Sequence, residues 1–227
     1  MIYTVISSLK ENRIEINKRD CRFIRQPLSL LSEKTKEYIE SGKNESHRAE
    51  RRLAYLTLIS SLKAFYNIDN PEITVNQQGK PYIKDKAVYF NLSHSNGMTV
   101  VCLSDEGEVG VDLQSEIDPE RAERLKERFF ASLEVKNESV GAKYYYCELS
   151  GEDAEIYRIT LPDFQPCEAD FSARWVSAES IMKLTGRGFA DADRVSDLKK
   201  GTKTEIKALD FEGKYYLAIS VSRRISI

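Results

Sequence analysis

The sequence predicts an α+β fold made of two similar α/β halves. Two observations lead to this prediction: a helix-like segment followed by strand-like segments occurs twice, and no low-complexity linker separates the two groups. The 227 residues, 41% hydrophobic and 31% charged, suffice for a substantial core, either as one large domain or as two small ones. We place the halves at 1–106 and 107–227.

The first half is predicted to hold a strand, a long helix and a group of strands. "MIYTVISS" is a first strand, and after the polar stretch 32–52 a helix begins near Ser46, with Leu53, Leu56 and Ala64 at helical spacing. "EITVN" and the turn "QQGKPYI" follow. Three β-rich runs, separated by Asn-Gly and Glu-Gly turns, then predict an antiparallel meander of "VYFNLS", "MTVVCLS" and "EVGVDLQ".

The second half repeats the helix and strand pattern with an added hairpin. Pro119 after Asp118 starts a charged amphipathic helix that runs through "RFF". Two strand-like segments around a Gly-Glu-Asp turn predict a hairpin, inserted at about 137–166. A second long helix ends at Gly186, and a last hairpin closes the chain near 204–222.

The composition argues against several classes of function. The 34 Lys and Arg residues nearly balance the 36 Asp and Glu residues, so no global field would attract nucleic acid or an anionic membrane. No stretch approaches the roughly 20 apolar residues that span a bilayer, and the N-terminus shows no basic leader, so we expect a cytoplasmic protein. The cysteines lack zinc-like spacing and are predicted to be reduced packing residues at positions 21, 102, 147 and 167.

Two regular spacings bring polar groups together. The strand period of two places Asp112 and Gln114 on one face of "VGVDLQ", and the helical period stacks Trp175, Glu179 and Lys183 on one stripe. Each pattern also has a structural reading. The Glu179–Lys183 pair fits a solvated ion pair worth about 0.2–0.5 kcal/mol, and Asp112 fits a buried hydrogen-bonding role as well as a metal or phosphate role.

His94 stands between two serines and, taken alone, also fits a hydrogen-bonded core histidine. The order of the motifs changes this interpretation. The chain resembles 4'-phosphopantetheinyl transferases of the longer, two-lobed, surfactin-synthetase-activating type, from about Arg48 to Gly186. The motifs that carry the resemblance are "GKPYI" (79–83), "FNLSHS" (90–95), "VGVDLQ" (109–114), "RFF" (128–130) and the Trp, Glu and Lys at 175, 179 and 183.

The resemblance implies an activity and its cofactors. Coenzyme A would lie in the cleft between the halves, and Mg²⁺ would hold its pyrophosphate. The reaction would transfer the 4'-phosphopantetheine arm to a serine of an acyl or peptidyl carrier protein and release adenosine 3',5'-bisphosphate. The chain would act as a monomer, because each half supplies what a partner subunit would otherwise bring.

The resemblance also implies roles for single residues. Asp112 and Glu179 would ligate the metal, with Gln114 at the third ligand position, and Glu179 would take the proton of the carrier serine. Lys183 would neutralise the pyrophosphate. The implied coenzyme A contacts are Arg48 at the 3'-phosphate with Lys34 or Lys36 assisting, Lys80 and Pro81 on the adenine side, Ser93 and His94 at a phosphate, and Lys183.

The sequence departs from the family pattern at two positions. Gln114 replaces the Glu of "GVDIE", and Ala178 replaces the lysine of "WxxKE". Both changes remove charge, so a catalytically impaired module that binds coenzyme A or a carrier is the alternative, and an unrelated α+β protein is the third reading. The added hairpin is either a decoration or a border of the carrier-docking surface, next to a basic rim on the 118–130 helix.

Overall fold

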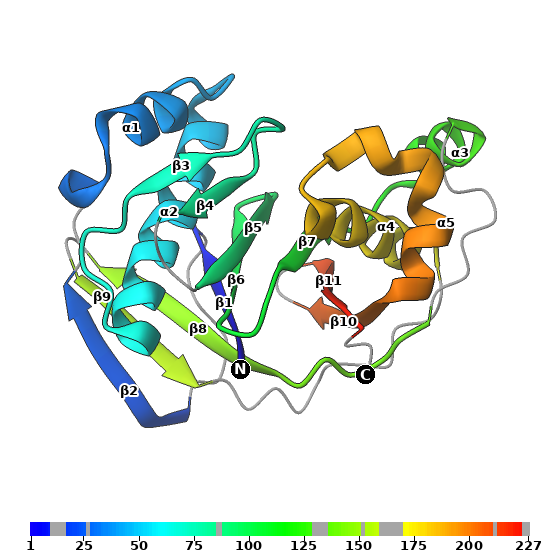
Figure 1. Cartoon of the computed structure of the whole chain (residues 1–227). Helices are drawn as coiled ribbons and strands as arrows, with labels where there is room; N and C mark the ends of the chain where they lie inside the picture. The colour runs from blue at the N-terminus through cyan, green and yellow to red at the C-terminus, as the bar shows by residue number, and fades with distance from the viewer. Residues whose placement is uncertain are drawn as a thin grey trace.

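The chain adopts an α+β fold, as the sequence predicts (Figure 1). The computed structural model describes residues 1–9, 17–25, 28–84, 88–128, 136–150, 153–158, 170–210 and 213–223. The elements are β1 (Ile2–Ser8), β2 (Asn17–Arg25), η1 (Leu28–Leu30), α1 (Glu33–Glu40), α2 (Glu45–Tyr66), β3 (Ile73–Val75), β4 (Pro81–Ile83), β5 (Tyr89–Ser95), β6 (Met98–Ser104), β7 (Val109–Ser115), α3 (Pro119–Arg128), β8 (Ala142–Ser150), β9 (Asp153–Arg158), α4 (Phe171–Thr185), η2 (Gly188–Arg194), α5 (Val195–Leu198), η3 (Lys199–Gly201), β10 (Thr202–Asp210) and β11 (Lys214–Ser222).

The first sheet has six strands in the order β2-β9-β8-β1-β6-β5. The β5–β6 hairpin and the β8–β9 hairpin both form as predicted. Strand β8 runs parallel to β1, so the added hairpin extends the sheet that contains the N-terminal strand. Figure 1 shows β8 and β9 crossing beneath α2 to meet β2.

The second sheet is smaller and has the order β10-β11-β7. The meander prediction was wrong for β7, which pairs with β11 instead of β6. The reason lies in the side chains of β7, because Val109, Val111 and Leu113 pack with apolar residues of β1 and β6 across the space between the two sheets. Burying this apolar face between two sheets leaves β7 with one strand neighbour among the described residues, which is β11.

The edge of β5 meets β7 through side chains. Asn91 Oδ1 accepts from the backbone N–H of Val111 at 3.0 Å, and Ser95 Oγ accepts from the N–H of Ser115 at 3.1 Å. We call this contact the β5–β7 seam. It satisfies backbone groups that a regular strand pairing would otherwise have satisfied, and it joins the two sheets.

The long helices begin and end at residues that cap them. Asn44 accepts from the N–H of His47 at 2.9 Å at the start of α2, and Asp170 accepts from Ala173 at 2.9 Å at the start of α4. Gly186 ends α4 in the left-handed conformation, with φ of 75°. Helix α1 was missed within the polar stretch, although Ser32 caps it through Thr35 at 3.2 Å.

Helix α4 packs closely on β7 at Gly110. A Cβ atom on this glycine would collide with the carbonyl oxygen of Ser180 and would lie 2.5 Å from the backbone nitrogen of Leu184. The face of β7 that carries Gly110 is therefore in contact with α4. The same face carries Asp112 and Gln114.

Replacing Gly110 by Ala is expected to lower the free energy of unfolding by about 2–3 kcal/mol, because backbone atoms of α4 cannot yield as a flexible side chain could. Urea unfolding would measure the loss. Gly201→Ala is the matched control, since a Cβ there meets nothing within 4 Å. Equal unfolding midpoints for the two variants would contradict the close packing.

Several other expectations can be compared with the described residues. Cys102 and Cys147 are free and buried, whereas the side chains at 21 and 167 lie outside the described part of the chain. The same holds for Phe129 and Phe130 of the "RFF" motif.

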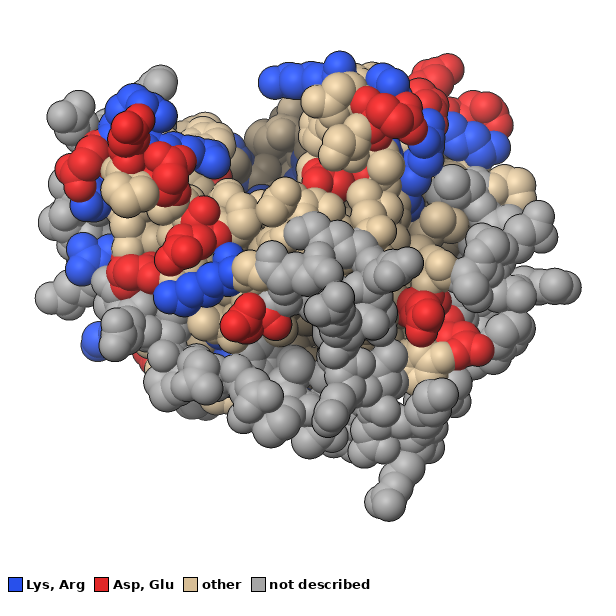
Figure 2. All heavy atoms as spheres, turned by 180° about the vertical axis from the view of Figure 1, so that it is seen from behind, with Lys and Arg blue, Asp and Glu red and all other residues tan. Residues whose placement is uncertain are grey.

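None of the helices described is both long and apolar enough for a membrane span. Figure 2 shows basic and acidic side chains interspersed over the described residues of one face.

Candidate active site between the two sheets

Asp112 lies at the centre of a polar cluster formed by β5, β7 and α4. Its side chain is only 3% exposed. Oδ1 accepts from Lys183 Nζ at 2.6 Å and from Ser93 Oγ at 2.8 Å, and Lys183 Nζ also lies 2.9 Å from Ser93 Oγ. Residues distant in sequence, at 93, 112 and 183, thus form one triad across the seam.

The other oxygen of Asp112 has no hydrogen-bond partner among the described residues, although it is buried. Burial and the negative charge of Asp112 raise the pKa of Glu179 to about 8, against the opposing effect of Lys183. Two carboxylates thus repel each other beside one ammonium, that of Lys183. An additional cation would relieve both the orphaned oxygen and the repulsion.

The donor chemistry of this acidic pair fits a hard divalent cation. Mg²⁺ takes oxygen ligands, usually from one or two carboxylates, together with water and substrate phosphates. No cluster of three or more His, Cys, Asp or Glu side chains suited to a metal occurs in the described ranges. Asp112 and Glu179 would thus need other oxygen atoms to complete the coordination.

Gln114 lies on β7 beyond Asp112, at the position predicted for a third ligand. Its amide nitrogen donates to Ser115 O at 3.1 Å and to Ser95 Oγ at 3.4 Å. These bonds hold the amide group at the seam. The carbonyl oxygen of an amide is a neutral ligand, so it would bind a cation more weakly than the carboxylate it replaces.

A pocket of about 250 Å³ adjoins the triad. Lys183 belongs to both, so the pocket borders the triad at this residue. The walls come from α1, α2, the β3–β4 hairpin, β5 and α4, and include Tyr38, Tyr55, Lys80, Pro81, Lys183 and Gly186. The predicted adenine-side residues therefore lie in the same pocket as the predicted phosphate ligand Lys183.

Lys80 connects the β3–β4 hairpin with β7 and α4. Its ammonium lies 3.2 Å from the carbonyl oxygen of Leu184 at the end of α4 and 3.4 Å from that of Val109, and it pairs with Glu108. A lysine at the C-terminus of a helix satisfies carbonyl groups and complements the helix dipole. The side chain of Lys80 therefore fixes the position of α4 as well as lining the pocket.

Replacing Lys80 by Met is expected to lower the free energy of unfolding by about 1–3 kcal/mol, because two carbonyl groups lose a charged donor while most of the packing volume remains. Urea unfolding measures this loss. Lys84→Met, at an exposed lysine of the same region, serves as the control. A loss no larger than that of the control would show that Lys80 does not hold α4.

The residues of α1 and α2 that are predicted to bind coenzyme A are not among those that line the pocket. Arg48 binds within its own region, to Glu45 Oε2 at 2.9 Å and to the carbonyl oxygen of Gly42 at 3.1 Å. Lys36 pairs with Glu33 at 2.7 Å, and Lys34 is exposed. Among the described residues, no hydrogen bond or ion pair connects Arg48 or either lysine with those that line the pocket, so their binding to the 3'-phosphate remains a prediction.

His94 is held from α2. Its Nδ1 lies 2.7 Å from Glu50 Oε2, and its ring centre lies 5.2 Å from that of His47. The spacing of α2 could have identified Glu50, because Ala54 and Leu58 follow it at i+4 and i+8 and are both fully buried. The aromatic pocket residues Tyr38 and Tyr55 were also missed, because neither stands in a recognised motif.

Ala178 occupies the position of the family lysine. It is fully buried and packs with Ile181, Met182 and Val195. A lysine at this position would have to leave or disturb an apolar cluster.

Comparison with known proteins identifies relatives over part of the chain. No protein-family model matches. A Synechocystis sp. protein provisionally named a 4'-phosphopantetheinyl transferase is 32% identical over 122 residues, which cover 52% of this chain and 41% of the relative. The 4'-phosphopantetheinyl transferase AcpT of Escherichia coli K12 is 43% identical over 68 residues, which cover 30% of this chain and 33% of the relative. AcpT of Salmonella typhimurium is 49% identical over 45 residues, which cover 19% of this chain and 23% of the relative. The chain therefore matches about two fifths of these relatives' lengths or less.

Proposed function

We propose that this chain, whose homologues are 4'-phosphopantetheinyl transferases, transfers the phosphopantetheine arm of coenzyme A to a serine of an acyl or peptidyl carrier protein. The observation that supports this most strongly is the acidic pair of Asp112 and Glu179, which borders Lys183 and the pocket. Carboxylates beside a lysine can hold a cation and a diphosphate together. The partial matches alone would not place these residues in one site.

The residues of the site divide the chemistry between them. Mg²⁺, held by Asp112 and Glu179, would neutralise the pyrophosphate and polarise its phosphorus. Lys183 would turn its ammonium from Asp112 to a phosphate oxygen, as a mobile point charge. Glu179 would accept the proton of the carrier serine, since a carboxylate positioned at the reacting hydroxyl acts as a general base.

The reaction balances without an oxidant or reductant. The serine oxygen forms a bond to the phosphorus that bears the pantetheine arm, and the bond from that phosphorus to the bridging oxygen breaks. Adenosine 3',5'-bisphosphate leaves with the bridging oxygen, and the serine proton passes to Glu179 or to solvent. The pocket beside Pro81 would hold the adenine side during this step.

The proposal extends to the arrangement of the two halves, the oligomeric state and the surface that meets the carrier protein. The strand orders β1-β6-β5 and β7-β11-β10 are alike, each with a long helix between its first strand and its hairpin, which supports two pseudo-twofold halves. We infer a monomer of the two-lobed type, acting in the cytoplasm. Arg121 on α3 is close enough to lower the pKa of Glu179, which supports a basic rim at the carrier entrance.

A transfer assay tests the activity. The protein is incubated with coenzyme A, Mg²⁺ and a panel of apo acyl and peptidyl carrier proteins, and the carriers are examined by mass spectrometry. The expected result is a carrier heavier by one phosphopantetheine arm, modified at its serine and only in the presence of Mg²⁺. No modification of any carrier, with coenzyme A shown to bind, would favour the alternative function.

The alternative is a module that binds coenzyme A or a carrier without catalysis, and Gln114 is the observation that favours it. Gln114→Glu distinguishes the two, and it is used without Ala178→Lys because Ala178 is buried in an apolar cluster. A non-catalytic module would gain transfer activity only in the variant. An active enzyme would already transfer as wild type and would require less Mg²⁺ in the variant.

A further inference from the structure

Glu50 is a buried carboxylate that neither the metal site nor the pocket uses. It is 8% exposed and lies on the face of α2 that packs against the first sheet. Oε2 lies 2.7 Å from His94 Nδ1, and Oε1 accepts from the N–H of Gly97 at 2.6 Å. One carboxylate thus binds both the end of β5 and the turn that follows it.

The hydrogen-bond partners of Glu50 determine where the proton lies between Glu50 and His94. Burial alone would raise the pKa of Glu50, but the hydrogen bonds from His94 and Gly97 outweigh it and hold the pKa below its usual range. An ionised carboxylate can only accept, so Nδ1 of His94 carries the proton of this bond. The other ring nitrogen, Nε2, is then the atom available for a substrate.

A tight turn follows β5, which explains why the ring of His94 needs a side chain to hold it in place. Asn96 and Gly97 both have positive φ, of 48° and 82°, in the tight connection between β5 and β6. Glu50 binds the turn at Gly97 and the ring of His94, so the strand end and the imidazole move as one unit. His47 packs against the same ring, with the two ring centres 5.2 Å apart.

We propose that Glu50 is the positioning residue of His94: its carboxylate binds the Nδ1–H and thereby directs Nε2 at a phosphate of the substrate. The identification of that phosphate as one of coenzyme A rests on the proposed function. A histidine ring that carries a proton on each nitrogen would donate to Glu50 through Nδ1 and to the phosphate through Nε2, and both hydrogen bonds would be charge-assisted. The same arrangement of carboxylate and histidine orients rings at many catalytic sites.

Glu50→Gln separates positioning from simple support of the turn. The glutamine carbonyl can still accept from Gly97, while its amide group would donate to Nδ1 and expel the proton from that nitrogen. A residue that only supports the turn would tolerate this change. A residue that positions His94 would not.

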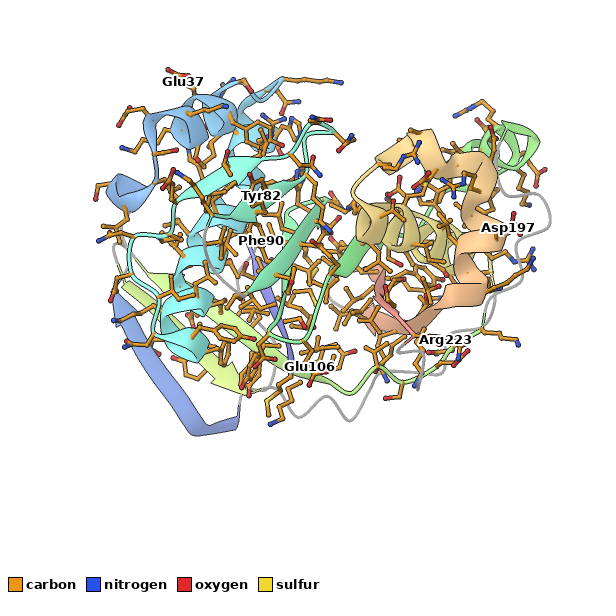
Figure 3. All side chains as sticks on the ribbon, in the orientation of Figure 1. Glu37, Tyr82, Phe90, Glu106, Asp197 and Arg223 are labelled. Atoms are coloured by element: carbon orange, nitrogen blue, oxygen red, sulfur yellow. The ribbon has the colours of Figure 1, made fainter. Side chains whose placement is uncertain are left out.

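Nuclear magnetic resonance of the ring nitrogens tests the contact without any ligand. The chain has two histidines, and His47→Ala assigns the remaining ring to His94. The expected wild-type spectrum shows a proton on Nδ1 of His94, which Glu50→Gln removes. Glu37→Gln is the control, at an exposed position that Figure 3 shows at the outer edge of α1. An unprotonated Nδ1 in the wild type, or an unchanged ring in Glu50→Gln, would overturn the inference.

Calorimetric titration with coenzyme A tests the consequence. Glu50→Gln is expected to weaken binding about tenfold, and to have no further effect in a His94→Ala background. Equal losses in both backgrounds, or no loss in either, would mean that Glu50 does not act through His94. If the ring is held as expected but the wild type binds no coenzyme A, the proposed function fails. A ring not bonded to Glu50 overturns the inference even when coenzyme A binds.

Discussion

Replacing Asp112 by Asn is expected to slow phosphopantetheine transfer by at least ~10³-fold, because one of the two proposed metal ligands loses its charge and several kcal/mol of charge stabilisation are lost with it. The substitution is nearly isosteric, so Ser93 can still donate to the side chain. Steady-state transfer to a carrier, measured at saturating Mg²⁺, gives the effect. Circular dichroism and thermal unfolding show whether the variant remains folded.

Asp197→Asn is the matched control for this prediction. Asp197 is exposed on α5 and pairs with Lys200 at 2.8 Å, and Figure 3 shows it at the outer side of the molecule. The same chemical change there should leave transfer at the wild-type rate. If Asp112→Asn, shown to be folded, transfers as fast as Asp197→Asn, the metal assignment is wrong.

The metal-free protein is expected to lose stability as the pH rises from about 5 to 8. Glu179 has a usual pKa of 4.5, and burial beside Asp112 raises it to about 8 in the folded chain. Between these values the folded chain holds a proton that the unfolded chain has released. The contribution of this proton to the free energy of unfolding is thus fully present below the usual pKa of Glu179. It is lost as the pH rises through the folded-state pKa, at no more than about 1.4 kcal/mol per pH unit.

Glu179→Gln tests the origin of this pH dependence. The variant cannot ionise at position 179, so its stability should fall less with pH, and it should exceed the wild type by at least about 1 kcal/mol at pH 8. Urea unfolding at pH 5, 6, 7 and 8 with a chelator measures both curves, and Mg²⁺ should restore wild-type stability at pH 8. A difference between the two proteins that does not grow with pH would contradict the buried acidic pair.

Much of the fold could be predicted because its segments carry strong local patterns. The cap at Asn44 and the glycine at 186 define α2 and α4, and turn residues define the β5–β6 hairpin. The partner of β7 could not be predicted in this way. Strand periodicity indicates which side chains share a face, but it does not determine which sheet that face covers.

The candidate site, like the fold, could be predicted from the sequence only in part. The strand period grouped Asp112 with Gln114, and the helical period grouped Glu179 with Lys183. The structure joins the two groups through the contact of Asp112 with Lys183 at 2.6 Å. The contact of Glu50 with His94 joins α2 to β5, and a single sequence contains no information on which carboxylate meets a given histidine. Ala178 was interpreted through its missing charge, whereas its packing in an apolar cluster became visible only in three dimensions.

In the proposed function, the carboxylates of Asp112 and Glu179 bind one divalent cation together. Titration of Mn²⁺ followed by electron paramagnetic resonance, with coenzyme A present, measures this binding directly and without catalysis. The account predicts one bound ion per chain in the wild type and an affinity at least ~10²-fold weaker in both Asp112→Asn and Glu179→Gln. Wild-type affinity in either folded variant would contradict it.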